Sequence, residues 1–169
     1  MRKAVIPFVL SMGLIAVWAV PAGAASTRAE YIAQVDPMCA ASVGPENDAA
    51  QRVIKNLRRL GSVANSGKAK GFVKQTRRTA GSITQLATID SNLTDQISAV
   101  PPPSADAGTI ASWLSGRRQS DASLNSAATA LRQYKFRVFL KRLKQAGAAD
   151  SAAKAAVSGF GFQVCGVVV

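Results

Sequence analysis

The chain has 169 residues, no histidine and a formal net charge of +12 at pH 7. The lack of histidine removes the commonest general base near neutral pH and the commonest metal ligand, so we expect no enzymatic activity, no metal and no cofactor. The excess of positive charge favours anionic partners and leaves their identity open.

Residues 1–24 are typical of a secretory signal peptide. Arg2 and Lys3 give a positive start, residues 4–20 are mainly apolar, and Ala22-Gly23-Ala24 forms a small-residue cleavage pattern. We therefore expect one mature domain over residues 25–169, secreted or associated with the cell envelope. The apolar run is short for a membrane span, so no transmembrane anchor is expected in the mature form.

The two cysteines, Cys39 and Cys165, lie far apart in the sequence. Their spacing has nothing of the close Cys-x-x-Cys pattern of metal or redox motifs, and an extracytoplasmic location permits disulfides. The sequence therefore predicts a Cys39–Cys165 disulfide that ties the start of the mature chain to an aromatic, glycine-spaced end, residues 158–166.

Apolar residues recur at helical spacing and strand alternation is absent, which predicts an all-α bundle of four to five helices closed by the disulfide. Thr27 and Glu30 form a capping-box pattern at the start of the first helix. Pro37 predicts a kink or a restart capped by Asp36, and Gly44-Pro45 predicts the end of this segment. A second helix is expected from about residue 46 to 60, with glycine at position 61 as its C-cap.

The clearest amphipathic segment spans about residues 68–99 and predicts a long third helix whose apolar stripe is interrupted by Asp90. Three prolines at 101–103 end it, and Ser104 is expected to cap a fourth helix that buries Trp113. The apolar phase then fails near Tyr134, so a fifth helix should begin there. Its apolar face is predicted at positions 136, 139, 140 and 143, with Asp150 capping a last alanine-rich turn.

Several short features together resemble a loose group of small, secreted, uncharacterised α-helical proteins of actinobacteria. The features are Cys39, the prolines at 101–103, Asp106, Trp113-Leu114, Phe139, and the aromatic-Gly-aromatic segment 160–162 followed by Cys165-Gly166. The resemblance implies a disulfide-closed helical bundle and no known activity. The chain departs from the group at Pro37 and at Tyr134-Lys135, where related sequences favour Gly-Asp.

Sequence motifs provide little evidence for catalysis. Ser151 and Lys154 match an S-x-x-K pattern, but neither companion motif of the penicillin-interacting serine enzymes occurs. The nine acids are scattered along the chain, with no pair spaced for acid and base work. Catalytic and metal-ligating residues are therefore not assigned.

Two basic stretches stand out. Residues 49–89 and the segment around residues 132–144 are rich in Lys and Arg and contain no Asp or Glu. Their cations recur three or four residues apart, so each set forms a positive stripe away from the apolar face. We predict binding to an anionic envelope polymer or lipid headgroups through Arg52, Lys55, Arg59, Lys70, Lys74, Arg77, Arg137, Lys141 and Lys144.

Other interpretations remain open from the sequence. The stripes are also typical of a surface kept charged only for solubility. The bundle is also compatible with a carrier of a small apolar ligand between its helices, or with a structural protein-interaction module. Nucleic acid is the less favoured polyanion because the protein is expected to be exported and has few aromatic residues outside its core. The sequence leaves the oligomeric state open.

Overall fold

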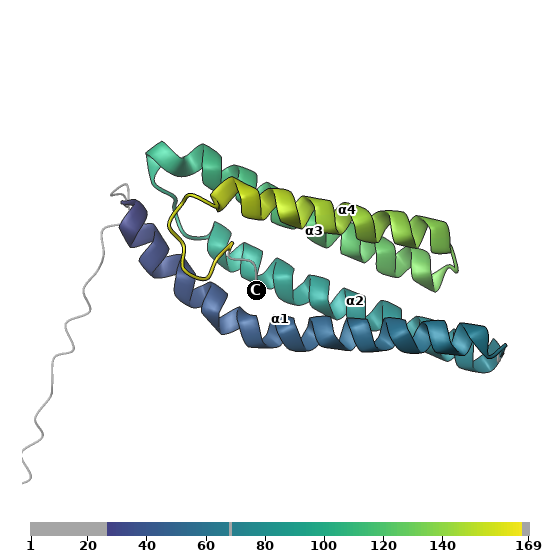
Figure 1. Cartoon of the computed structure of the whole chain (residues 1–169). Helices are drawn as coiled ribbons and strands as arrows, with labels where there is room; N and C mark the ends of the chain where they lie inside the picture. The colour runs from purple at the N-terminus through teal and green to yellow at the C-terminus, as the bar shows by residue number, and fades with distance from the viewer. Residues whose placement is uncertain (1–26, 68, 167–169) are drawn as a thin grey trace, which may run out of the picture.

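The computed structural model describes residues 27–67 and 69–166, so the expected signal peptide lies outside the described residues. Over the described part the chain is all-helical and has no strand. It forms α1 (Arg28–Asn65), α2 (Ala69–Ser98), a short 3-10 helix η1 (Ser104–Asp106), α3 (Ala107–Arg132) and α4 (Phe136–Val157) (Figure 1). Cys39 and Cys165 are disulfide-bonded. The predicted all-α, disulfide-closed bundle is therefore confirmed.

The helix α1 is one continuous element where two were predicted. The Thr27–Glu30 capping box starts it as expected, but the helix continues through Pro37, Pro45 and Gly61. Each proline removes a backbone hydrogen bond, yet both lie on the solvent side, where water can satisfy the freed carbonyl groups. The buried face stays continuous along α1, and packing maintains the helix with a bend between its N-terminal part and the rest (Figure 1).

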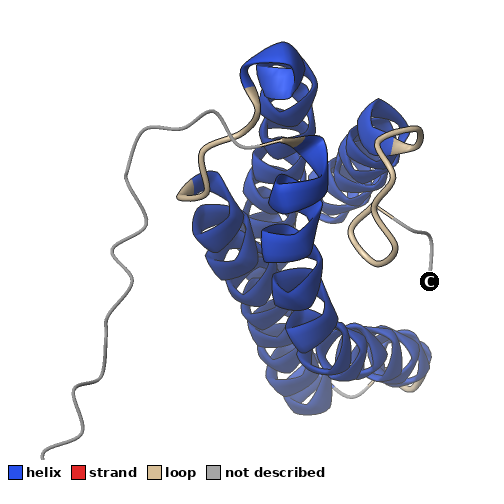
Figure 2. Ribbon diagram, turned by 90° about the vertical axis from the view of Figure 1, so that its left-hand side faces the viewer, coloured by secondary structure: helices blue, strands red, loops and turns tan. Residues whose placement is uncertain are grey.

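Consecutive helices pack against each other. α1 packs on α2, α2 on α3 and α3 on α4, and among the described elements no comparable interface joins α1 to α4. The view down the bundle in Figure 2 shows the α1–α2 and α3–α4 pairs with the C-terminal loop beside them. The bundle is thus open along the α1–α4 side, apart from the C-terminal segment that crosses it.

Residues 158–166 cross from α4 back to α1 and are held there by the N-terminal part of that helix. The backbone N–H groups of Gln163, Val164 and Cys165 donate to the Asp36 carboxylate at 2.7, 3.2 and 3.0 Å. Asp36 therefore binds the tail, and the prediction that it caps a restarted helix is wrong. Phe160 and Phe162 pack on the buried Tyr31 ring, where burial raises the pKa of Tyr31 to about 12.

Two apolar clusters make up the core. The disulfide core surrounds Cys39–Cys165 and includes Trp113, whose predicted burial is confirmed. The distal core lies toward the other end of the bundle and is built around Leu60, Ile83, Leu131 and Phe139. On each helix a charged residue lies in the sequence between members of the two clusters: Glu46, Asp90, Arg117 and Asp150.

The remaining boundaries agree in part with the sequence. Residues 104–106 form a 3-10 turn and Asp106 occupies the N-cap of α3, so Ser104 is not the cap of that helix. A break near Tyr134 is confirmed, with Gln133–Lys135 separating α3 from α4. α4 continues past residue 150 without a new cap. Leu140, predicted on the apolar face, is 62% exposed.

Candidate functional site

The basic stretches of the sequence converge at one end of the bundle. Consecutive helices run antiparallel, so the second half of α1, the first part of α2, the last part of α3 and the first part of α4 all lie at the right-hand end of Figure 1. We call residues 49–89 and 122–149 the basic end. They hold nine and six of the chain's 21 lysines and arginines, and no Asp or Glu.

All nine residues predicted to bind a polyanion are exposed and lie in the basic end. Among the described residues, none of them forms an ion pair with a carboxylate. The described ion pairs instead involve Arg28, Arg117 and Lys154, outside this region. The positive charge of the basic end is therefore not neutralised within the described chain.

The predicted cations belong to three helices, α1, α2 and α4. The structure places all three sets at the same end of the bundle, where each set remains a separate stripe on its own helix (Figure 1). The sets on α1 and α2 lie on helices that pack together. The set on α4 is connected to α2 through aromatic contacts. The centroid of the Phe72 ring of α2 lies 5.8 Å from that of Phe136 of α4 and 6.3 Å from that of Tyr134. The aromatic residues thus occupy the space between the basic stripes.

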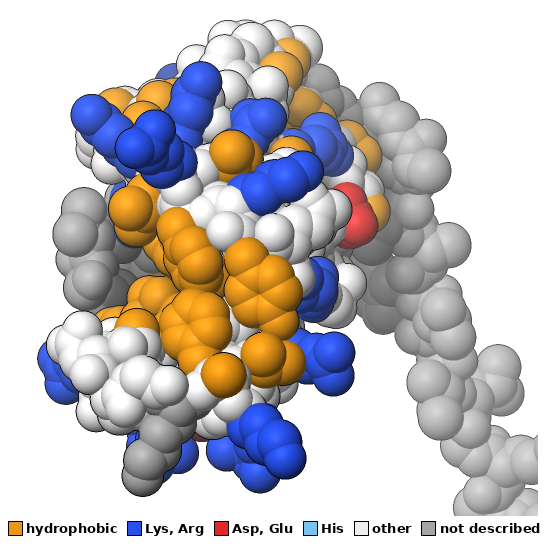
Figure 3. Space-filling model, turned by 90° about the vertical axis from the view of Figure 1, so that its right-hand side faces the viewer, with side chains coloured by type: hydrophobic (Ala, Val, Ile, Leu, Met, Phe, Trp, Pro, Cys, Tyr) orange, Lys and Arg blue, Asp and Glu red, His pale blue; other side chains and the backbone are white. Residues whose placement is uncertain are grey.

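These aromatic residues form an exposed apolar surface that sequence reasoning missed. Phe72, Tyr134, Phe136 and Leu140 make up what we call the apolar patch; the last three are exposed and Phe72 is partly buried. Figure 3 shows apolar side chains gathered in the middle of this end, with Lys and Arg side chains around them. The patch was missed because apolar residues at helical spacing were assigned to the core.

A second candidate site is a cleft of about 380 Å³ on the open α1–α4 side of the bundle. All four helices and the C-terminal segment line it, and the Cys39–Cys165 disulfide forms one of its walls. Charged side chains from each helix reach it: Glu46, Asp90, Arg117, and the ion pair of Asp150 with Lys154 at 3.1 Å. Lys154 of the S-x-x-K pattern is therefore engaged with Asp150.

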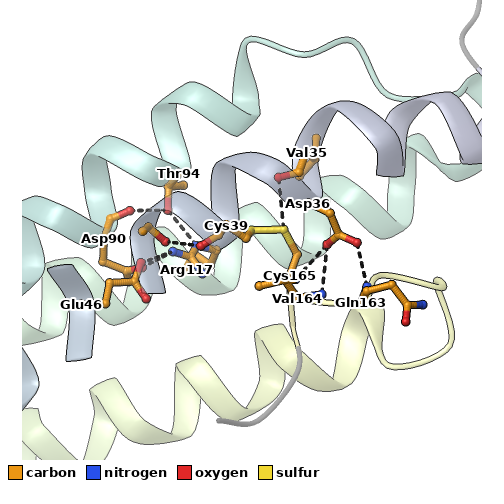
Figure 4. The surroundings of a disulfide bond; sticks show 11 residues. Val35, Asp36, Cys39, Glu46, Asp90, Thr94, Arg117, Gln163, Val164 and Cys165 are labelled. Atoms are coloured by element: carbon orange, nitrogen blue, oxygen red, sulfur yellow. Dashed lines mark hydrogen bonds and ion pairs between the residues drawn. A yellow bond between two sulfur atoms is a disulfide. The ribbon is translucent and has the colours of Figure 1, made fainter. Parts of the chain in front are cut away.

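Arg117 organises the charged part of the cleft. Its guanidinium pairs with Asp90, its Nε donates to Thr94 Oγ1 at 2.9 Å, and Glu46 lies 4.0 Å away. Figure 4 shows this cluster beside the disulfide. Burial raises the pKa of Glu46, while Arg117 opposes that rise. Asp90, which interrupted the predicted stripe of the third helix, is thus explained by its partner on α3.

Asp121 of α3 is 5% exposed and interacts electrostatically with Asp90 and Arg117 of this cluster. Neither of its carboxylate oxygens has a hydrogen-bond partner in the described chain. Burial, together with the nearby Asp90, raises the pKa of Asp121 to about 8. Near neutral pH the Asp121 carboxyl is therefore largely protonated, since its charged form would be desolvated and would lie beside the Asp90 carboxylate.

The charged residues of the cleft carried a signal that sequence reasoning did not use. Arg117 and Asp121 continue the three- and four-residue spacing of the apolar stripe of α3 between Leu114 and Leu124. Charged residues at stripe positions of more than one helix indicate a polar cluster inside a bundle. Which residues pair there depends on how the helices pack.

No protein family, curated protein or solved structure matches this chain. Of the helices in residues 27–67 and 69–166, none is both long and apolar enough to cross a membrane. Within the same residues, no group of three or more His, Cys, Asp or Glu side chains is placed to hold a metal ion.

Proposed function

We propose that this protein acts outside the cytoplasm as a non-enzymatic module that binds anionic surfaces of the cell envelope through its basic end. The observation that carries the proposal is the convergence of three cationic segments at one end of the bundle, with no carboxylate in those segments to neutralise them. Such a concentration of unpaired charge attracts polyanions over several ångströms and binds them in a salt-dependent way. The disulfide supports an oxidising compartment.

Retention on a heparin matrix tests the proposal. The protein should elute only at raised salt, and reversing Lys70, Lys74 and Arg77 to Glu should make it elute earlier. For DNA, each charge contact changes the slope of log affinity against log salt by about 0.7–0.9, and a sulfated polymer should behave similarly. The triple variant should therefore lower that slope by roughly 2, while its helical circular dichroism stays unchanged because all three side chains are exposed.

A matched pair of single variants separates position from net charge. Arg77→Glu and Arg118→Glu each change the charge by two at an exposed helical arginine, but only Arg77 lies in the basic end. We expect earlier elution for Arg77→Glu alone. Equal elution of the two variants, or retention that survives high salt, would show that the stripes form only a solvated surface.

The cleft is the observation that favours a second candidate function, the carriage of a small ligand. Its volume of about 380 Å³ is within the range of small-molecule sites. Its charged residues do not suit a wholly apolar ligand, because such a ligand would keep water from Glu46, whose Oε1 has no hydrogen-bond partner among the described residues. Organic extraction of purified protein followed by mass spectrometry tests this role, and a carrier should yield one recurrent compound with a polar group.

A further inference from the structure

We infer that the anionic surface bound by the basic end is a lipid bilayer, with the apolar patch inserted among the headgroups. This inference rests on the proposed function and specifies its target. The basic end has two properties that a surface kept charged only for solubility does not need to combine. It has unpaired cations, and it exposes the apolar side chains of Tyr134, Phe136 and Leu140.

The exposed apolar residues are concentrated at this end of the molecule. The large hydrophobic residues that are exposed among the described residues are Ile54, Tyr134, Phe136, Val138 and Leu140, and all of them belong to the basic end. Exposed apolar clusters of this kind usually mark interaction sites. Solubility alone would favour the opposite arrangement, with apolar side chains kept away from the surface.

Charge complementarity selects an anionic partner for this patch. Lys135 follows Tyr134 directly, and Arg137 and Lys144 lie within one helical turn of Leu140. Long cationic side chains around an apolar centre place their charged heads at phosphate groups while the centre enters the acyl boundary. Basic residues next to an anionic membrane are attracted to its headgroups within a Debye length.

A hydrophilic anionic polymer would bind the cations of the basic end but would leave the apolar patch exposed to water. Its charges can pair with the cations, but it provides no apolar layer for Leu140 and Phe136. Nucleic acid would need free ring faces for base stacking. One face of the Tyr134 ring packs against Phe72, at an interplanar angle of 26°. Of the large hydrophobic residues in the described part of the chain, the aliphatic Leu140 is the most exposed. A bilayer interface matches both the aliphatic and the aromatic parts.

The backbone at Tyr134 has an uncommon conformation. Tyr134 has φ +57°, in the left-handed region that glycine adopts freely and bulky residues avoid. This conformation belongs to the turn that ends α3, where the Lys135 N–H donates to the Ala130 carbonyl at 2.9 Å, and it presents an exposed ring at the tip of the α3–α4 turn beside Phe72.

Two apolar substitutions test the inference without changing the charge of the basic end. Leu140→Ser removes the most exposed apolar side chain, and Tyr134→Gly removes the ring while relieving the backbone. The double variant should remain folded, with its helical circular dichroism as in the parent, because both side chains are exposed. Its partition onto phosphatidylglycerol-containing vesicles should fall by roughly tenfold, since most of the apolar area available for insertion is lost. Its elution from heparin should be unchanged.

The control measurements separate this inference from the proposed function. The parent protein should bind phosphatidylglycerol vesicles and not vesicles of phosphatidylcholine alone. If it binds heparin but not the anionic vesicles, or if the double variant binds those vesicles as the parent does, the bilayer inference is overturned while polyanion binding stands. If the parent binds neither heparin nor the anionic vesicles, the proposed function itself fails.

Discussion

Asp121 shows how a single buried carboxyl group affects the stability of this bundle. It lies at a stripe position of α3, where an apolar residue would otherwise pack, and it has no hydrogen-bond partner for its oxygens in the described chain. Its pKa of about 8 is raised above the ordinary value of 3.8. The folded state therefore holds the proton more tightly than the unfolded state, and this preference links stability to pH.

The stability contribution of Asp121 should be full below about pH 4 and should be lost progressively as the pH rises to about 8. Because one pKa unit corresponds to about 1.4 kcal/mol, we expect the free energy of unfolding to fall by at least about 2 kcal/mol over this window. The raised pKa of Glu46 acts in the same direction. Asp121→Asn should flatten this dependence, as measured by urea denaturation at several pH values.

Glu30→Gln is the control for this measurement. The capping-box hydrogen bonds with Thr27 lower the pKa of Glu30, so its contribution is lost only as the pH falls below the ordinary carboxyl range. The variant should therefore change the pH dependence of stability only below about pH 5 and leave it as in the parent from about pH 5 to 8. A parent protein whose stability does not vary between pH 4 and 8 would contradict the assignment to Asp121.

At the scale of the elements, the α3–α4 interface depends on a close approach at Gly116. A Cβ added there would lie 2.8 Å from Ala153 Cβ and 3.1 Å from Ala153 Cα. Ala153 is buried and its backbone cannot move without separating the two helices. Small residues at this crossing let α3 and α4 pack closely, and the alanine-rich part of α4 owes its stability to that approach.

Gly116→Ala should therefore destabilise the protein by about 1–3 kcal/mol, since overpacking at a helix interface costs more than the gain in helix propensity. Gly81→Ala is the matched variant in α2, because a Cβ at that exposed position meets nothing within 4 Å. It should stabilise the protein by up to about 1 kcal/mol. Chemical denaturation of both variants checks the pair, and equal effects would show that the α3–α4 crossing is not tight.

At the scale of the whole molecule, the chain is closed at one end and open at the other. The disulfide, the Asp36 hydrogen bonds and the Phe160–Phe162 pair hold the C-terminal segment across the gap between α1 and α4. Among the described residues the basic end has no such covalent link, and its helices meet through the distal core. The covalent closure of the bundle thus lies away from the proposed binding surface.

Replacing Cys39 and Cys165 by Ser should lower the free energy of unfolding by about 2–5 kcal/mol, because the bond closes a loop with a sequence separation of 126. Hydrogen exchange should show protection lost first at the backbone amides of residues 163–165, which bind Asp36. Heparin retention should stay as in the parent in a variant that remains folded. Unchanged stability would mean that packing of the tail alone closes the bundle.

Features that depend on residues three or four apart were predictable from the sequence. Helical periodicity determined the all-α class, the extent of α2 and the burial of Trp113. The phase change near Tyr134 identified the α3–α4 turn, and the Thr27–Glu30 pattern identified the start of α1. The cysteine pairing followed because two cysteines allow a single intramolecular bond.

Tertiary packing decided what local pattern left undetermined. α1 continues through Pro37 and Pro45 because its buried face remains packed on both sides of them. Asp36 binds a segment more than a hundred residues away, and Asp90 pairs with Arg117 on the next helix. Leu140 fits an apolar stripe in the sequence but faces solvent, since the neighbouring helices cover only the adjacent face of α4. The order and direction of the helices bring the cations to one end of the bundle. That arrangement results from the burial of apolar helix faces against one another, and the spacing of residues within one helix does not determine it.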